Sequence, residues 1–352
     1  MIKVLGLTLW GNKAASHRMR LRQYKQGLLD SNIDLEVHHL LDNQYLERRF
    51  DGKGISMLNV LPRVISRLKV VLSKDNYDVT ILHCELIPFI PGWVEKLLLP
   101  KPYIFDFDDA WHLRYKLNRS YLFKLFFKNK VDKVVEGATL VMAGNSYLHD
   151  YASSLNSKTN IFPTVLDTDR YQPKPNNNSD KFIIGWIGSP STAPYLKKLI
   201  PSLTQLGLEG SVLLRVIGGK APNIPNIEVE EMPWSEGTEV YHINSFDIGV
   251  MPLVDDEWSK GKCAFKLLQY MACELPVVAS NVGANIDVVS SDCGYLVDSD
   301  QAWLDAMRSL RDNLEQRSSF GKNGRKKVIQ SYSLKSNLPI LIKAIKGISK
   351  KA

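Results

Sequence analysis

Short apolar runs alternate with stretches of helical period along the whole chain. Runs of four to eight apolar residues, separated by amphipathic segments, are typical of parallel strands covered by helices on both faces. The first half is therefore predicted to form an α/β domain with a doubly wound sheet. Its predicted strands are Ile2–Leu9, Leu35–Leu40, Val79–His83, Tyr103–Phe107 and Leu140–Ala143.

A second alternation begins after a segment rich in Pro, Asn and Ser between residues 160 and 181, which indicates a linker. We therefore predict two Rossmann-like domains, 1–165 and 181–335, with a linker at 166–180 and a helical tail at 336–352. Two such domains leave a cleft between them, and α/β sheets bind ligands at the carboxyl ends of their strands. The predicted strands of the second domain are Phe182–Ile187, Val212–Ile217, Ile227–Val229, Asp247–Met251, Val277–Ser280 and Tyr295–Val297.

The composition is that of a globular protein: of 352 residues, 44% are hydrophobic and 23% are charged, which excludes disordered and fibrous classes. The apolar run from Val4 to Trp10 turns polar without a cleavage site, so it is interpreted as a strand rather than a signal peptide. No stretch is long enough to span a bilayer. Four cysteines without zinc or disulfide spacing favour a reduced, cytoplasmic protein.

The positive charge is concentrated in the first half: 25 Lys and Arg stand against 18 Asp and Glu through Pro175, and 20 against 19 beyond it. Residues 114–137 are predicted to form a basic amphipathic helix with aromatic side chains, which suits an anionic membrane surface; ordinary core packing is the alternative. No nucleic-acid motif is present, so nucleic acid is not an expected partner. The predicted apolar face holds Leu117, Tyr121, Leu122, Leu125 and Phe126, with Lys116, Arg119, Lys124, Lys128, Lys130 and Lys133 around it.

Two strand–loop–helix connections in the second domain are candidates for binding phosphate. In the stretch after Asp255, the segment KCAF is predicted to be a loop that leads into the N-terminus of a helix. Lys262 and Lys266 add positive charge at that end of the helix, where the helix dipole is also positive. A solvated lysine pair is the alternative. The other connection is FIIGWIGSPST, where Gly185 and Gly188 allow close backbone approach and three hydroxyls follow, from Ser189, Ser191 and Thr192. Two such connections suit a diphosphate, and neither matches a Walker loop or GxGxxG.

Acidic and histidine residues follow two predicted strands of the first domain. In FDFDDAWH, Asp108, Asp109 and His112 crowd a carboxyl end, which predicts an acid–base or metal site; a helix cap is the alternative for Asp109. His83 and Glu85 follow another strand and are candidates for acceptor binding, or for purely structural roles. In the basic loop after the first strand, the Arg18 guanidinium is the candidate for reaching phosphate or a phosphorylated acceptor.

The ordered landmarks of the second half carry a resemblance to a known family. IGWIGSPST, RVIGG, FDIGVMPL, KLLQYMACELPVVASNVGANIDVV, CGYLV and GKNGRKKVIQSYS resemble glycosyltransferase family 4, the retaining glycosyl transferases group 1 type of the GT-B fold. In the first half the likeness is weaker, in SHRMRLRQY, DVTILHCELIP and FDFDDAWH. The resemblance implies two Rossmann-like domains facing across a cleft, and transfer of a sugar from a nucleotide-diphosphate donor with retained anomeric configuration.

The resemblance also implies roles for residues of this chain. The donor is a substrate, so no cofactor is expected, and the enzyme would be metal-independent with a saccharide or lipid-linked acceptor. The predicted catalytic residues are Asp108, Asp109, His112 and Lys266, and the acceptor would contact Arg18, His83 and Glu85. The donor would contact Gly188, Ser189, Ser191, Thr192, Arg215, Trp234, Lys262, Ala264, Phe265, Lys266 and Gln269.

Three positions depart from the family pattern. Family members usually carry two glutamates eight residues apart, and here Gly261 and Gln269 occupy those positions, while Glu274 stands where glycine is usual. The Gln269 amide could still hold ribose hydroxyls. The missing carboxylates leave open the alternative of a non-catalytic sugar-nucleotide-binding partner of a transferase. A sugar-nucleotide epimerase of the same fold is a third alternative, disfavoured because the first domain would then need to bind only a small substrate.

Overall fold

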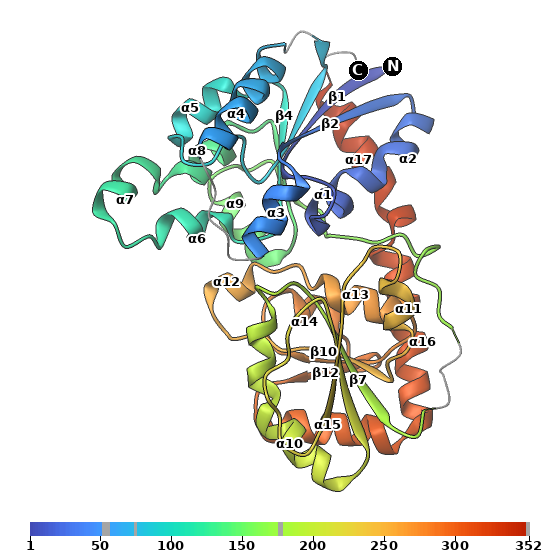
Figure 1. The fold of residues 1–352 in the computed structure, drawn as a ribbon. Helices are drawn as coiled ribbons and strands as arrows, with labels where there is room; N and C mark the ends of the chain where they lie inside the picture. Colours follow the sequence, from blue (N-terminus) through green and yellow to red (C-terminus); the bar gives the residue numbers. More distant parts are fainter. Residues whose placement is uncertain (51–56, 74–75, 175–178, 350–352) are drawn as a thin grey trace. The chain divides into compact units, whose positions relative to one another are not determined.

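The computed structural model describes residues 1–50, 57–73, 76–174 and 179–349 (Figure 1). The chain divides into two compact units: unit 1 comprises Met1–Val165, Lys260–Cys263 and the chain from Leu334 onward, and unit 2 comprises Leu166–Ser259 and Ala264–Ser333. Residues 175–178 of the predicted linker and 350–352 of the predicted tail lie outside the described residues.

Unit 1 is built on a six-stranded parallel sheet in the order β2-β1-β3-β4-β5-β6. Strand β1 lies between β2 and β3 and pairs with both, so that Val4 lies opposite Leu35 and Val79. The prediction for the first half is confirmed for its five strands, while β6 escapes prediction because three residues give too short a pattern. The strands are β1 Ile2–Trp10, β2 Ile33–Leu41, β3 Val79–His83, β4 Tyr103–Phe107, β5 Leu140–Ala143 and β6 Thr159–Ile161.

The C-terminal helix α17 packs in unit 1 although it lies at the other end of the sequence (Figure 1). Its Leu341 and Ile345 are buried in one cluster with Val4 of β1. A side chain at Gly27 of α2 would collide with Leu338, since a Cβ there would lie 2.4 Å from the leucine. The helices of unit 1 are α1 Ala15–Arg20, η1 Arg22–Tyr24, α2 Lys25–Asp30, α3 Asn43–Phe50, α4 Met57–Leu72, α5 Gly92–Leu98, α6 Trp111–Lys116, α7 Tyr121–Phe127, α8 Lys130–Gly137, α9 Ser146–Ser153 and α17 Leu334–Ile348.

The single basic helix predicted over 114–137 is wrong. The structure has three helices there, α6, α7 and α8. The Ser120 hydroxyl accepts the backbone N–H of Phe123 and so caps a new helix, a local signal that the apolar period alone does not show. Lys130, predicted on the wet face, is 1% exposed.

Unit 2 is built on a second parallel sheet in the order β12-β11-β10-β7-β8-β9. Gly185 of β7 and Gly249 of β10 are paired, and side chains at those positions would overlap the rings of Phe246 and Tyr270. The structure therefore gives Gly185 a packing role, not the close approach to a ligand expected from the sequence. The strands are β7 Phe182–Ile187, β8 Val212–Ile217, β9 Glu228–Met232, β10 Ile248–Met251, β11 Val277–Ser280 and β12 Gly294–Val297.

Both faces of this sheet are buried, which explains the continuous apolar runs. Ile183 and Ile187 belong to one buried cluster, and Ile184 and Trp186 to the other. The prediction of two doubly wound α/β halves is thus confirmed. None of the helices formed by the described residues combines the length and the apolar character needed to cross a bilayer. The helices of unit 2 are η3 Ala193–Leu199, α10 Ile200–Glu209, α11 Glu239–Ile243, α12 Glu257–Lys260, α13 Phe265–Ala272, α14 Ala284–Val288, α15 Asp300–Asp312 and α16 Leu314–Ser331.

Candidate functional site

The strand order of unit 2 points to the ends of β7 and β10. These neighbours in the sheet are followed by connections that lead to opposite edges, a topological switch point at which α/β sheets bind ligands. The loop after β7 contains Gly188 to Thr192, and the chain after β10 leads to α13. Both phosphate-binding segments predicted from the sequence therefore follow strands at this point.

Lys266 connects these two segments. Its Nζ lies 3.4 Å from the Thr192 hydroxyl and 4.9 Å from the centre of the Trp186 ring. A Cβ at Gly188 would lie 2.8 Å from Lys266 Cε, so the absence of a side chain there leaves room for the lysine. Ser189 and Ser191 hydroxyls are 2.8 Å apart in the same loop. The structure thus brings together the ammonium group and the hydroxyls predicted to meet a diphosphate.

The start of α13 adds backbone donors. Ala264, its N-cap, has a left-handed backbone (φ 52°) and, being alanine, offers the helix no side-chain cap of its own. The first amides of α13, beginning at Phe265, carry the positive end of the helix dipole and suit an anion. The element after the Gly188 loop is a 3-10 helix instead of the α-helix expected there.

Trp234 and Gln269 are connected through one buried carboxylate. The Trp234 indole N–H donates to Glu239 at 2.8 Å, and the Tyr171 hydroxyl donates to the other oxygen of Glu239 at 2.7 Å. The Gln269 amide in turn donates to the Tyr171 oxygen at 3.0 Å. Neither Tyr171 nor Glu239 is a sequence candidate, because the Tyr171–Glu239 and Tyr171–Gln269 contacts join residues that are 68 and 98 positions apart along the chain.

Two other predicted donor residues have different partners. Arg215 lies within β8, where its guanidinium is ion-paired with Glu230 at 2.6 Å and donates to Ser245. Lys262 belongs to the Lys260–Cys263 segment of unit 1, and its Nζ is 3.8 Å from Asp109.

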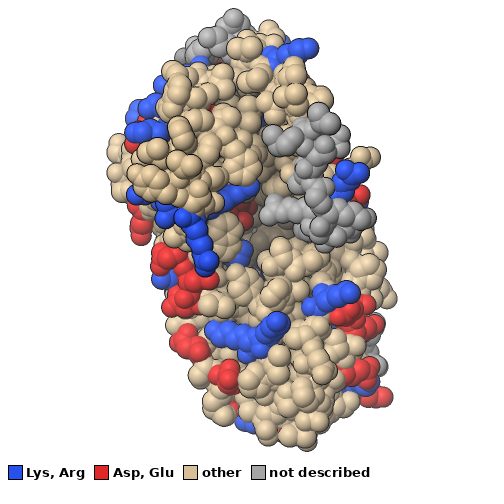
Figure 2. Space-filling model, turned by 60° about the vertical axis from the view of Figure 1, so that its left-hand side comes forward, with Lys and Arg blue, Asp and Glu red and all other residues tan. Residues whose placement is uncertain are grey.

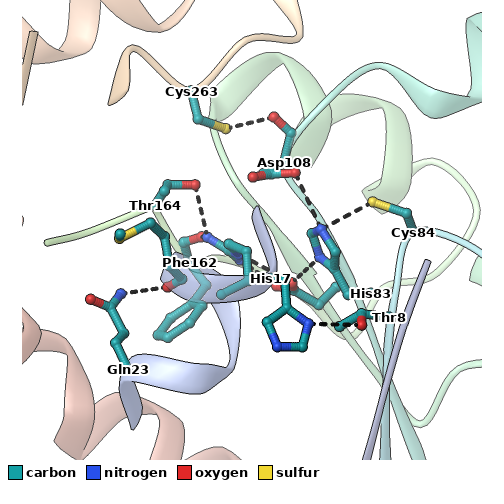
Figure 3. Close-up of polar contacts among 12 residues, drawn as sticks. Thr8, His17, Gln23, His83, Cys84, Asp108, Phe162, Thr164 and Cys263 are labelled. Carbon is teal, nitrogen blue, oxygen red and sulfur yellow. Dashed lines mark hydrogen bonds and ion pairs between the residues drawn. The ribbon is translucent and has the colours of Figure 1, made fainter. Parts of the chain in front are cut away.

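That segment packs against the end of β4. The Cys263 thiol donates to the Asp108 carbonyl at 3.0 Å (Figure 3). The Asn145 amide donates to the carbonyl of Lys262 at 2.9 Å. A Cβ on Gly261 would lie 2.6 Å from Ala110 Cβ and 2.7 Å from its backbone nitrogen. A glutamate at position 261 would therefore require this backbone to move, so the close packing against Ala110 explains why glycine occupies the position.

A buried network of charges lies at the end of β3 and β4 in unit 1. His83 Nδ1 is 2.7 Å from Asp106, and Arg20 forms a two-point ion pair with the same carboxylate while donating to the Phe162 carbonyl at 2.8 Å (Figure 3). Burial opposes ionisation of Asp106, but Arg20 and His83 outweigh it and lower the Asp106 pKa. Burial likewise opposes protonation of His83, yet Asp106 and Asp108 raise its pKa.

The second nitrogen of the His83 ring contacts a thiol and a second carboxylate. Its Nε2 is 3.2 Å from Cys84 Sγ and 3.5 Å from Asp108 Oδ1 (Figure 3). Among the described residues, these three side chains form a group whose potential metal-ligand atoms lie within 4.8 Å of one another. Burial and then the nearby carboxylates raise the Cys84 pKa well above its ordinary value. The raised pKa favours the protonated thiol over the thiolate that binds metals.

The remaining predicted residues of the first half divide between surface and interior. The N-cap of α6 is Ala110, not Asp109, and the Asp109 side chain is 40% exposed near Lys262. His112 is buried, and its ring stacks on Tyr151 of α9 at 3.8 Å.

Glu85 and Arg18 are engaged in holding the fold. Glu85 is 1% exposed and forms ion pairs with Arg114 at 3.0 Å and with Lys130 at 3.1 Å. Lys130 is also paired with Glu95 at 3.0 Å. Arg18 of α1 donates to two carbonyls of the loop that precedes this helix, at 2.9 and 3.1 Å. These contacts favour the structural alternative for Glu85.

A buried basic group at the ends of β1 and β2 is not evident from the sequence. Arg67 of α4 is 3% exposed and donates to the carbonyls of Thr8 and His38 at 2.6 and 3.1 Å. The Thr8 hydroxyl is 3.0 Å from His17 Nδ1, and burial together with the charge of His39 lowers the His17 pKa to about 4. Burial lowers the Arg67 pKa to about 10.

Comparison with protein families identifies the segment that contains the Gly188 loop, Lys266 and Gln269. Residues 183–313 match the family model described as Glycosyl transferases group 1. Comparison with curated protein sequences gives no match.

Solved structures share the fold across nearly the whole chain. Sucrose-phosphate synthase from Thermosynechococcus elongatus matches with a TM-score of 0.72 and 13% identity over 99% of each chain. Anabaena HepE in complex with UDP and glucose matches with a TM-score of 0.69 and 15% identity over 98% of this chain and 100% of its own. The lipopolysaccharide outer core galactosyltransferase WaaB matches with a TM-score of 0.65 and 11% identity over 98% and 99%. The chain thus has the GT-B fold of these glycosyltransferases and carries, in residues 183–313, a domain of the glycosyl transferases group 1 family.

Proposed function

We propose that this protein is a retaining glycosyltransferase of the family 4 type, which moves a hexosyl or deoxyhexosyl group from a nucleotide-diphosphate sugar to a saccharide or lipid-linked acceptor. One observation carries the proposal. Within the segment that matches the glycosyl transferases group 1 model, Lys266 lies beside the hydroxyl-bearing loop that follows β7, in the first turn of α13, whose N-cap is an alanine.

This arrangement suits a departing diphosphate. When the bond between the sugar and the phosphate breaks, negative charge develops on the leaving oxygen, and pre-positioned donors stabilise that charge. The Lys266 ammonium, the first amides of α13 and the hydroxyls of Ser191 and Thr192 would supply such donors without a metal ion. Metal independence and retention are parts of the proposal.

The nucleoside would lie near the Trp234–Gln269 chain of contacts. Trp234 is next to Gly218, where a Cβ would be 2.9 Å from the tryptophan and 2.5 Å from the Gly188 carbonyl. Trp234 therefore lies next to the same loop, where it can contact a base. The Gln269 amide can form a further hydrogen bond, to a ribose hydroxyl. Because Arg215 is ion-paired within the sheet, we assign it a supporting role.

On the acceptor side we propose His83, Asp108 and Asp109. They lie at the carboxyl ends of β3 and β4, and the raised pKa of His83 favours a protonated ring that can donate hydrogen bonds. Asp109 is the exposed carboxylate of the group. His112, stacked on Tyr151, would act by holding α6 in place.

We further propose a role in bacterial surface polysaccharide assembly, at the cytoplasmic face of the membrane. The solved structures that share this fold include one described as a lipopolysaccharide galactosyltransferase and one in complex with UDP and glucose, which supports UDP-sugars as the first donors to test.

The test is to incubate the purified protein with a panel of nucleotide sugars, with and without membrane extract as acceptor, and to follow nucleoside diphosphate release. We expect release that depends on one donor and on the extract. Binding without release would favour the non-catalytic partner suggested by Gly261 and Gln269. Conversion of the donor sugar without acceptor would favour an epimerase.

A further inference from the structure

Helix α7 is apolar over most of its circumference, but only one side is packed. Phe123 stacks on Tyr115 with ring centres 6.0 Å apart, and Phe123 and Phe127 are 4.9 Å apart, which defines the inner side. On the other side, four large apolar residues are 60–79% exposed. At about 100° per residue they lie within an arc of roughly 140°. They are Tyr121, Leu122, Leu125 and Phe126.

The exposed face continues beyond the helix. Leu117, just before α7, is 67% exposed. We call these five side chains, Leu117, Tyr121, Leu122, Leu125 and Phe126, the α7 surface. Contiguous exposed apolar side chains of this kind mark interaction sites.

The charges next to the α7 surface are basic. Lys124 and Lys128 are four residues apart and border the apolar arc, and Arg119 precedes the helix. No acidic residue occurs between Leu117 and Asn129. Figure 2, in which the left-hand side of Figure 1 comes forward, shows uncharged surface with Lys and Arg, and also some Asp and Glu, at its edges. The expected partner is therefore both apolar and anionic.

We infer that the α7 surface docks on an anionic lipid bilayer. Tyr, Phe and Leu side chains would enter the boundary between headgroups and acyl chains, and the lysines would meet the lipid phosphates. A second copy of this chain fits less well, because a symmetric contact would bring the same basic border against itself. The inference extends the proposed function by naming the surface that would bring the enzyme to a lipid-linked acceptor.

The experiment is co-sedimentation of the full chain with vesicles rich in phosphatidylglycerol or made of phosphatidylcholine alone, without nucleotide or acceptor. Wild type should bind the anionic vesicles at low salt, release at high salt, and ignore the zwitterionic ones. Substituting Leu122, Leu125 and Phe126 together by Ser, or Lys124 and Lys128 together by Glu, should weaken binding at least about tenfold.

Matched controls lie in unit 2. Leu208 and Leu314 are 65% and 68% exposed, so changing both to Ser tests the loss of apolar exposure elsewhere, and Lys322→Glu with Lys326→Glu tests charge elsewhere. The controls should bind like wild type. Equal loss in the controls, no binding by wild type, or a dimer in solution that the Ser variant abolishes would each overturn the inference. Because no transfer reaction is measured, failure here leaves the proposed function standing.

Discussion

Replacing Lys266 by Ala removes a half-buried cation that contacts Thr192 and Trp186. These two contacts contribute little in the free protein, because a 3.4 Å contact to a hydroxyl is weak and a cation–π contact contributes about 0.5–1 kcal/mol. With a diphosphate bound, the missing charge-assisted hydrogen bond should cost about 1.5–3 kcal/mol. At 1.4 kcal/mol per tenfold, nucleoside diphosphate binding should weaken by about 10- to 150-fold.

The assay is titration calorimetry with the nucleoside diphosphate released by the preferred donor, followed by the rate of transfer. Lys197→Ala is the control, because this exposed lysine lies on η3 of the same unit. We expect the control to bind and react like wild type. Unchanged affinity in Lys266→Ala, or an equal loss in Lys197→Ala, would refute the assignment of Lys266 to the diphosphate.

Three further predictions follow from buried polar groups. Arg20→Met should lower the free energy of unfolding in urea by about 3–5 kcal/mol, because it leaves Asp106 charged, buried and without its guanidinium; a loss under about 1 kcal/mol would contradict this. Gln269→Glu should lower Tm at pH 8, because the new carboxylate and Glu239 would compete for the one hydroxyl proton of Tyr171. The Tm of the variant should approach that of wild type towards pH 5, where a carboxylate can take up a proton; equal Tm of variant and wild type at pH 8 would contradict this. The pKa of His17 is about 4 in the folded protein against an ordinary 6.5, so the free energy of unfolding should fall by about 2–3 kcal/mol as the pH drops from 6.5 to 4. Urea titration at each pH measures this, and the fall should be smaller in His17→Asn.

The sequence pattern is sufficient to predict the sheets because their central strands are buried on both faces. Runs such as Phe182–Ile187 therefore carry the signal in every residue, whereas three-residue β6 does not. Helix boundaries are harder to predict. The apolar period continues through Leu117 and Tyr121, but the Ser120 cap starts a new helix between them.

The candidate site can be predicted only where it is local in sequence. The Gly188 loop and Lys266 each lie in a short motif. Pairings between distant residues cannot be predicted from composition or period, as with Arg20 and Asp106, 86 residues apart. Lys130 is predicted at the surface, but its burial depends on Glu85 and Glu95, which come from another part of unit 1.

The most direct test of sugar transfer uses a nucleotide sugar labelled in the sugar, membrane extract and the purified protein. We predict that label enters the lipid or saccharide fraction in proportion to the nucleoside diphosphate released, with the anomeric configuration of the donor retained in the product by NMR. No transfer and no release across the panel of nucleotide sugars, by protein that is folded, would contradict the proposed activity; an inverted product would contradict retention.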